Sequence, residues 1–505
     1  MSVDAGAQPG SARSRMRVLA ALRSTLSATD VAGMEQCATR LLAGLPRETV
    51  AENVVMVAYG GGKDSSYTLA FVRAVQLCLF ERLGTTFRLR SVTNRHVGMP
   101  QAVMDNIDRA YTALGFTGDP DCEALLVDGR AVKPFARYEP LPPDVVRRNR
   151  LDLLMTGHRT FGESRPTFCN ACNLSMVNSF GMAAAHAGGV DVIITGDSPE
   201  EQRAYSLWIR RLSHRFNPGA RQDGGFRGFL EATDRISALY FADLYGPDAA
   251  AEIGERAVAS DVPAEIRFFS IFDDTRYSSG EHWPLLTGLL GFEFDELAFS
   301  FTESDCGNPT LMAHLRGLKC EVVYGREYAE GLAEYVDFAE SLMRMKEFPQ
   351  HLIDVIRARY AGPDAAQRMR EVAGAFASAA YDLTERQLVC MLQSPFTEKG
   401  RRLEAYLEAE HPDRAGQVDA LHALLAGEGE PLDDAEAALA DWLTGASGLE
   451  LGRLRTLYLS EAVRFSRQGG PGILAAIVEG DPHKAEIRTR FSADGPETLE
   501  FITGR

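Results

Sequence analysis

The sequence predicts an α/β fold built on a parallel sheet, followed by a mainly helical C-terminal region. From Asn53, short apolar runs such as VVMVAY alternate with amphipathic helical segments, which is typical of parallel strands joined by crossover helices. A glycine-rich turn stands between the first apolar run and a long helical segment. Beyond about Glu330 the apolar residues follow helical spacing, as in YVDFAESLMRMKEF and HLIDVIRARY.

The length of the chain predicts more than one folding unit, because 505 residues exceed one ordinary hydrophobic core. We expect residues 1–50 to form a disordered tail and an N-terminal helix. Residues 51–330 should form the α/β domain, Rossmann-like in its strand and helix alternation, and residues 331–505 a helical accessory domain. The tail should be disordered to about residue 15, and one helix should then run to Leu45, where Pro46 ends it.

The composition limits the function classes. A formal net charge of -17 disfavours a protein that coats nucleic acid by bulk attraction. Eight cysteines, most of them single in apolar stretches as Cys78 and Cys390 are, do not make a disulfide framework, so we expect a reducing, cytoplasmic location. Because the chain lacks an uninterrupted apolar run of about 18 residues, we expect no membrane partner.

Three strands can be predicted individually. The first, VVMVAY, leads into the glycine turn. The second, Leu89 to Thr93, is followed by a helix through Ala113. The third, residues 190–197, follows a helix that begins near Leu174, and its near-continuous apolar run suits a strand buried on both faces.

The turn between the first strand and its helix reads Tyr59-Gly-Gly-Gly-Lys-Asp-Ser-Ser66. Backbone N–H groups and the helix dipole hold anions at such a position, and glycines let the backbone approach a phosphate closely. The turn is not a Walker A loop, because Val57 and Asp64 occupy places where that motif needs Gly and Ser or Thr. A glycine-rich turn without a ligand is the alternative, and the Lys63-Asp64 pair argues against it.

This stretch resembles the PP-loop motif Ser-Gly-Gly-x-Asp-Ser of the ATP pyrophosphatase superfamily, with Gly60 in place of the leading Ser. The resemblance covers about residues 51–325. It implies an adenine nucleotide alpha-hydrolase-like fold that binds ATP and Mg²⁺ and holds the departing pyrophosphate while the alpha phosphorus is attacked. We expect Lys63 and Asp64 to lie exposed in the loop. The residues that the resemblance assigns are catalytic Lys63, Asp64 and Ser65, and nucleotide-binding Gly60, Gly61, Gly62 and Ser66, with the base near Ser91 to Asn94.

A CxxC pair and an acidic turn give a second set of candidates. Cys169 and Cys172 have a spacing that lets two thiolates reach one metal or cluster. The pair precedes a strand that ends in TGDSPEEQ, which resembles PP-loop tRNA thiolation enzymes, where the strand ends in Gly-His-x-x-Asp-Asp. In the present chain Gly196 matches, Asp197 replaces the His, and Glu200 and Glu201 stand where the two Asp would be. The two glutamates could bind Mg²⁺, or could simply favour a helix N-terminus.

Cys306 provides a third thiolate. Thiolases of this superfamily that carry a [4Fe-4S] cluster use a CxxC and a later cysteine, so Cys169, Cys172 and Cys306 could hold such a cluster with one iron open. A structural Zn²⁺ completed by His282 or His314 is the first alternative. Three ordinary reduced cysteines are the second.

Three functional hypotheses follow. The first is ATP-dependent adenylylation of a substrate oxygen, forming AMP and pyrophosphate, with sulfur or nitrogen transfer to a small molecule. It draws on a resemblance to N-acetyl sugar amidotransferases, in which Gly-Gly-Lys-Asp-Ser is followed by Tyr, here Tyr67 after Ser66. A sulfur donor or a glutaminase would then be a partner, and the C-terminal region could cap the substrate or form a homodimer. The second hypothesis is tRNA base thiolation, and the third is a non-catalytic protein that binds ATP or AMP.

Overall fold

The structure is a computed structural model of the chain. It describes residues 8–162, 179–196, 199–216, 225–262, 265–275, 282–293, 308–345, 347–427, 432–463, 470, 472–479 and 484–503.

A six-stranded sheet forms the centre of the N-terminal half, with strand order β4-β3-β2-β1-β5-β6. Neighbouring strands are parallel, except that β4 pairs with β3 in the antiparallel sense. The predicted parallel α/β architecture is therefore confirmed, and the second and third predicted strands correspond to β2 and β5. The strands are β1 Val54–Ala58, β2 Arg88–Arg95, β3 Cys122–Asp128, β4 Ala131–Pro134, β5 Val192–Ile194 and β6 Arg267–Phe268.

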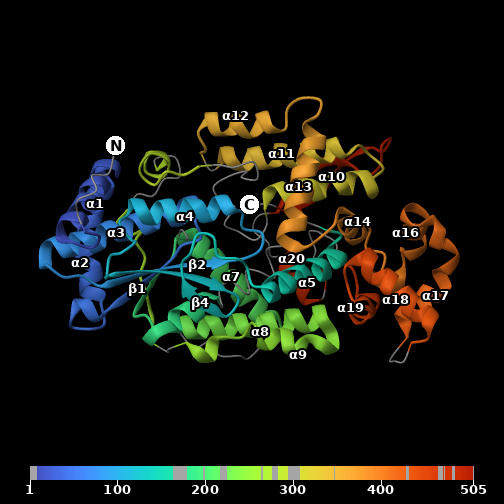
Figure 1. Cartoon of the computed structure of the whole chain (residues 1–505), viewed down its shortest axis with the longest axis horizontal. Coiled ribbons are helices and arrows are strands. Elements are labelled where there is room, and N and C mark those ends of the chain that lie inside the picture. Colours follow the sequence, from blue (N-terminus) through green and yellow to red (C-terminus); the bar gives the residue numbers. More distant parts are fainter. Residues whose placement is uncertain are drawn as a thin grey trace.

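Helices cover the sheet and make up most of the C-terminal half (Figure 1). In the N-terminal half they are α1 Ala12–Thr25, α2 Ala28–Gly44, α3 Lys63–Leu83, α4 Gln101–Ala113, α5 Pro143–Thr160, α7 Pro199–Phe216, α8 Gly225–Tyr245, α9 Ala249–Gly254 and α10 Pro309–Val322. The C-terminal helices are α11 Tyr328–Met345, α12 Gln350–Arg359, α13 Ala365–Tyr381, α14 Glu385–Gln393, α15 Thr397–Gly400, α16 Leu403–Glu410, α17 Val418–Ala426, α18 Asp434–Ser447, α19 Leu451–Tyr458 and α20 Ile473–Glu479.

The pleat of the strands divides the interior between the two faces of the sheet. Val55 and Val57 of β1 belong to a large core that also contains the apolar residues of α3 and α4. Met56, between them, belongs to a second core with Ile193 of β5 and Leu230 of α8. Alternate residues of a strand point to opposite faces, so the sheet is buried on both sides, as the apolar sequences of its strands predict.

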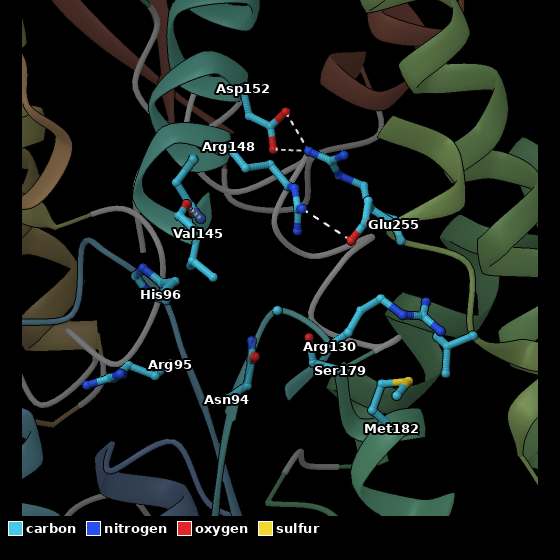
Figure 2. A pocket seen from close by; sticks show the side chains of 14 residues that line it. Asn94, Arg95, His96, Arg130, Val145, Arg148, Asp152, Ser179, Met182 and Glu255 are labelled. Carbon is cyan, nitrogen blue, oxygen red and sulfur yellow. Dashed lines mark hydrogen bonds and ion pairs between the residues drawn. The ribbon is translucent and has the colours of Figure 1, made fainter. Parts of the chain in front are cut away.

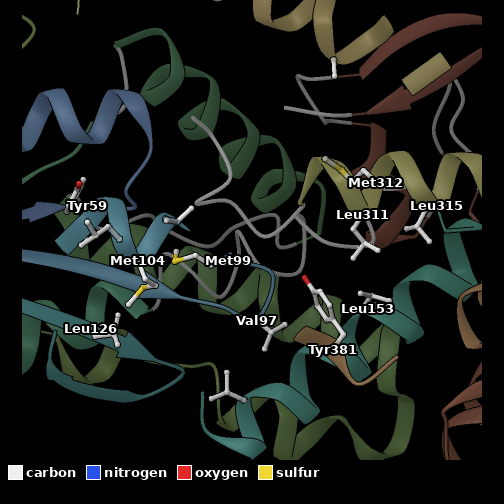
Figure 3. Packing of buried hydrophobic residues seen from close by; sticks show 14 of the residues in the cluster. Tyr59, Val97, Met99, Met104, Leu126, Leu153, Leu311, Met312, Leu315 and Tyr381 are labelled. Carbon is white, nitrogen blue, oxygen red and sulfur yellow. The ribbon is translucent and has the colours of Figure 1, made fainter. Parts of the chain in front are cut away.

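The C-terminal half is mostly helical, as expected, but it also contains a two-stranded antiparallel sheet, β7 Lys484–Arg490 and β8 Glu497–Thr503. Within β7 the side chain of Thr489 is buried and accepts hydrogen bonds from Arg316 of α10 and from Arg326. The large core runs past residue 330 without interruption, and Figure 3 shows members from both halves, including Tyr59 and Tyr381. The predicted division at residue 330 is not tested by these contacts and stays a prediction.

Two properties of the described residues bear on cellular context. No helix among them is both long and apolar enough to cross a bilayer. The five cysteines that the structure describes, Cys37, Cys78, Cys122, Cys320 and Cys390, are all free thiols.

The N-terminal segment differs from the prediction. It forms two helices rather than one, because Leu26 and Ser27 are extended and the Ser27 side chain caps α2 by accepting from the Asp30 N–H. Helix α1 begins at Ala12, inside the stretch for which we predicted disorder, and Arg15 is buried.

A buried ion triad explains this early start. The Arg15 Nε donates to Asp119 at 3.0 Å, and Arg73 Nη2 of α3 donates to the same carboxylate at 2.7 Å. All three side chains are at most 5% exposed. Burial alone would raise the pKa of Asp119, but the Arg73 and Arg15 guanidinium groups outweigh it and lower the pKa. The triad therefore ties α1 to α3 and to the start of β3.

We expect Asp119→Ala to lower the free energy of unfolding by about 3–5 kcal/mol, because it leaves the buried Arg73 guanidinium without its carboxylate and Arg15 with only the partly exposed Asp121. Urea denaturation followed by circular dichroism measures this change. Asp108→Ala is the matched control, since its side chain is 40% exposed and its partner Arg137 lies 3.8 Å away. A loss in Asp119→Ala no larger than that in Asp108→Ala would contradict the assignment.

Candidate functional site

The glycine turn lies where the strand order of the sheet reverses. From β1 the chain proceeds to β2 and β3 on one side, and later adds β5 and β6 on the other side of β1. Open α/β sheets bind ligands in the crevice outside the carboxyl ends of the strands at such a reversal. The turn, residues 59–62, leaves the carboxyl end of β1 at this point and leads directly into α3.

Gly61 and Gly62 give the turn its shape. Gly61 has φ +79°, and a Cβ at this position would lie 2.9 Å from side-chain carbons of Val103 and Ile107 in α4. Gly62 is the N-cap of α3 and offers no side chain to the amides of the first helical turn. The N-cap residue therefore makes no side-chain bond to them, and a helix N-terminus without such a cap is the usual basis of anion binding.

The placement of Lys63 corrects one expectation. Its side chain is only 2% exposed, so it does not lie in an exposed loop, whereas Asp64 is 36% exposed. The Lys63 Nζ lies 3.1 Å from Asp64 Oδ1. Helix α3 begins at Lys63, so this side chain belongs to the first helical turn rather than to an open loop. The result is a buried positive charge beside a half-exposed carboxylate at the first turn of α3.

The two serines of the motif point back into the turn. Both hydroxyls donate to the Gly62 carbonyl, Ser65 Oγ at 3.1 Å and Ser66 Oγ at 2.7 Å. Thr93 of β2 donates through its hydroxyl to the Tyr59 carbonyl at 2.8 Å. These bonds fix both ends of the turn, and they leave Ser66, which is fully buried, in a supporting role rather than at an open surface.

Gly196 lies against the start of α3. A Cβ on Gly196 would lie 3.0 Å from Ser65 Cα and 3.2 Å from Ser65 N. Because these are backbone atoms of a helix, they cannot move aside cheaply. The segment after β5 and the glycine turn after β1 therefore share one end of the sheet.

The two residues expected near the nucleotide base, Ser91 and Asn94, have different surroundings. The Ser91 side chain is buried toward α4 and its hydroxyl lies 2.9 Å from the Tyr111 hydroxyl, so this side chain does not face the edge of the sheet. Asn94, three residues further along β2, lies at the carboxyl edge and lines a pocket. Of the two candidates, Asn94 is the one whose side chain a ligand could contact.

Several predicted site residues cannot be placed. Cys169, Cys172, Cys306 and Asp197 lie outside the described residues, and Glu200 and Glu201 belong to α7 but their side chains are not described. Within the part of the chain that is described, no group of three or more His, Cys, Asp or Glu side chains is arranged to hold a metal ion. The cluster, the zinc site and the magnesium ligands all stay predictions.

The two histidines considered for zinc have different surroundings. His314 of α10 is fully buried, and its Nδ1 lies 2.9 Å from the Tyr328 hydroxyl. The His282 ring contacts the Tyr67 ring of α3 in a tilted arrangement, with ring centroids 3.9 Å apart. Burial lowers the pKa of His282, and Asp30, Lys63 and Asp64 all contribute to its electrostatic environment. His282 therefore lies near the glycine turn, a proximity that sequence analysis did not predict.

A pocket opens beside the glycine turn, at the carboxyl ends of β2 and β3 (Figure 2). Its empty volume, which includes an open mouth, is about 660 Å³. The residues of the glycine turn do not line it. Its lining residues are Asn94, Arg95, His96, Gly129, Arg130, Val145, Arg148, Asn149, Asp152, Ser179, Met182, Glu255, Arg256 and Val258.

Sequence analysis missed all of this lining except Asn94. The residues come from β2, the β3–β4 turn, α5, the helical segment 179–185 and the segment after α9, and they carry no motif. Only their arrangement in space brings them together.

The comparisons with known proteins add no family. No protein-family model matches the chain, and no curated protein matches it. What stands is the α/β architecture with its mostly parallel six-stranded sheet, which is compatible with a Rossmann-like fold.

We expect Gly196→Ala to lower the free energy of unfolding by about 1–3 kcal/mol, because the added methyl group overpacks against the backbone of Ser65. Gly374→Ala in α13 is the control: a Cβ there meets nothing within 4 Å, and this change should be neutral or stabilising by up to about 1 kcal/mol. Urea denaturation of both variants measures the difference. Equal stability of the two variants would show that Gly196 does not pack tightly against α3.

Proposed function

We propose that the chain is an enzyme that transfers the adenylyl group of ATP to an oxygen atom of a small molecule and releases pyrophosphate. A sulfur or nitrogen nucleophile then attacks the activated carbon and displaces AMP. One observation carries the proposal: the glycine turn at the strand reversal leads directly into the N-terminus of α3, with Gly196 against it.

The residues of the turn fit a polyphosphate. At Gly61 a side chain would fill the turn, and at Gly62 no capping side chain occupies the amides of α3. Backbone N–H groups at a helix N-terminus suit phosphate oxygens, because the amides donate hydrogen bonds to an anion and the helix dipole also favours negative charge there. The sequence motif that resembles a PP-loop lies in these same residues.

Lys63 and Asp64 would help to stabilise the negative charge of the leaving group. The buried Lys63 ammonium, 3.1 Å from Asp64, can support negative charge that accumulates on the departing pyrophosphate. Asp64 holds this ammonium at the start of the helix and, being 36% exposed, reaches the surface of the turn. Bound ATP would supply the adenylyl group, and Mg²⁺ would neutralise the leaving group.

The acceptor is proposed to be a small molecule rather than tRNA. The formal net charge of -17 repels a polyanion such as tRNA at long range. The open pocket beside the turn combines apolar side chains with a few polar groups, as small-molecule sites do. Whether sulfur or ammonia is the nucleophile depends on Cys169, Cys172 and Cys306, and metal analysis of anaerobically purified protein would decide between a cluster and zinc.

The test uses ATP labelled at the alpha phosphate, Mg²⁺ and the small-molecule fraction of a cell extract as the source of acceptor. We expect labelled AMP and an equal amount of pyrophosphate, and we expect Asp64→Asn to reduce their formation by roughly a hundredfold, because Lys63 loses its charged partner in the turn.

Asp108→Asn is the matched control for Asp64→Asn, since the two carboxylates have similar exposure, 40% and 36%. It should retain the rate of the unchanged protein. Formation of ADP and phosphate instead, or equal rates in the two variants, would contradict the proposed function.

A further inference from the structure

The pocket beside the glycine turn is lined by other residues than the predicted phosphate site, and these residues suit a different ligand group. We propose that it binds a small organic molecule through a single carboxylate group, held by Arg148, with an apolar body against the pocket wall. That this molecule is the acceptor of the adenylyl group rests on the proposed function.

Arg148 is the central donor. It lies on α5 with a side chain that is 20% exposed, and its guanidinium donates to Glu255 at 3.2 Å. No other hydrogen bond of this guanidinium occurs within the described part of the chain. Glu255 is 52% exposed, and ion pairs of this exposed kind contribute little to stability. A guanidinium has five N–H donors in a planar fork, so most of the Arg148 donors remain for a ligand.

Arg130, on the turn that follows β3, is already engaged. Its Nη1 donates to the Ala257 carbonyl at 2.6 Å and its Nη2 to Asp261 at 3.0 Å, so Arg148 is the arginine with donors left for a ligand. The other arginines of the lining, Arg95 and Arg256, are buried in pairs with Asp128 and Asp152. Figure 2 shows Arg148 and Arg130 on different sides of one open space, with the Arg148–Glu255 pair drawn as a dashed line.

Asn94 adds a polar side chain to the same pocket. The residue is only 8% exposed. Because it lines the pocket, its amide can donate to a ligand oxygen or accept from a ligand N–H there.

The charges around the pocket favour a carboxylate over a phosphate. The Arg148 guanidinium is already matched by one carboxylate, that of Glu255, and a ligand carboxylate can replace it with the same single charge. A phosphate would bring up to two negative charges close to Glu255, Asp261 and Asp152, and a polyanion would bring more. Arginine also accepts a carboxylate in bidentate geometry.

Part of the wall is apolar. Val145, Met182 and Val258 contribute to the lining, and they come from three different segments of the chain. Ligand sites commonly combine such a wall with a few polar groups that fix orientation. The expected ligand therefore has an apolar body with one carboxylate.

The test uses benzoate as a probe, with benzamide as its neutral counterpart and phenyl phosphate as its dianionic counterpart. Binding to the full chain is measured by saturation-transfer NMR and calorimetry without ATP, so the result is independent of the proposed reaction. We expect benzoate to bind more tightly than either counterpart. Arg148→Gln should weaken benzoate binding about tenfold or more, because a charge-assisted hydrogen bond is lost, and should leave the affinity for MgATP unchanged.

Arg147→Gln is the matched control, since Arg147 is the adjacent, exposed residue of α5 and does not line the pocket. It should bind benzoate as the unchanged chain does. Circular dichroism checks that both variants are folded. Equal benzoate binding by the two variants, tighter binding of phenyl phosphate or benzamide, or a loss of MgATP affinity in Arg148→Gln would each overturn the proposal.

Discussion

The central strand β1 is the constraint on which the rest of the structure depends. It pairs in parallel with β2 on one side and with β5 on the other, and Val55, Met56 and Val57 are completely buried. With neighbours at both edges and cores on both faces, the strand has one position and one register. The glycine turn that leaves its carboxyl end is therefore fixed in space, and Gly196 reaches the start of α3 because β5 is registered on β1.

Helix α5 connects this centre to the C-terminal half. Its N-terminal part contributes Val145 and Arg148 to the pocket, while its C-terminal part packs against α14, where a Cβ on Gly157 would lie 2.2 Å from the sulfur of Met391. Burial lowers the pKa of His158, the next residue, to about 3, so this end of α5 is packed with a neutral imidazole at neutral pH. The C-terminal helices thus support one wall of the pocket through α5, a positioning role for a region that carries no recognised motif.

Sequence analysis predicted the features that local patterns determine. The apolar run of β1, the glycine turn and the helix after it follow one another in the chain, and their order alone indicated the α/β architecture. The burial of Lys63 was not predictable, because it depends on where α3 begins and not only on the residue types in the turn. Disorder was wrongly predicted at residues 12–15 since composition does not reveal that Arg15 meets Asp119, a partner far away in the sequence. The pocket could not be predicted for the same reason: its residues come from separate segments that only the folded sheet assembles.

The central claim is that the glycine turn at the strand reversal holds the phosphates of a nucleotide. Hydrogen–deuterium exchange tests it most directly, with the chain saturated with α,β-methylene-ATP and Mg²⁺, since this analogue cannot be split between its alpha and beta phosphates. The account predicts slower exchange of the amides of residues 60–66, at the start of α3, and no change in α18, which is remote in the chain from the turn. Nucleotide binding with unchanged exchange at residues 60–66, or protection confined to other segments, would contradict it.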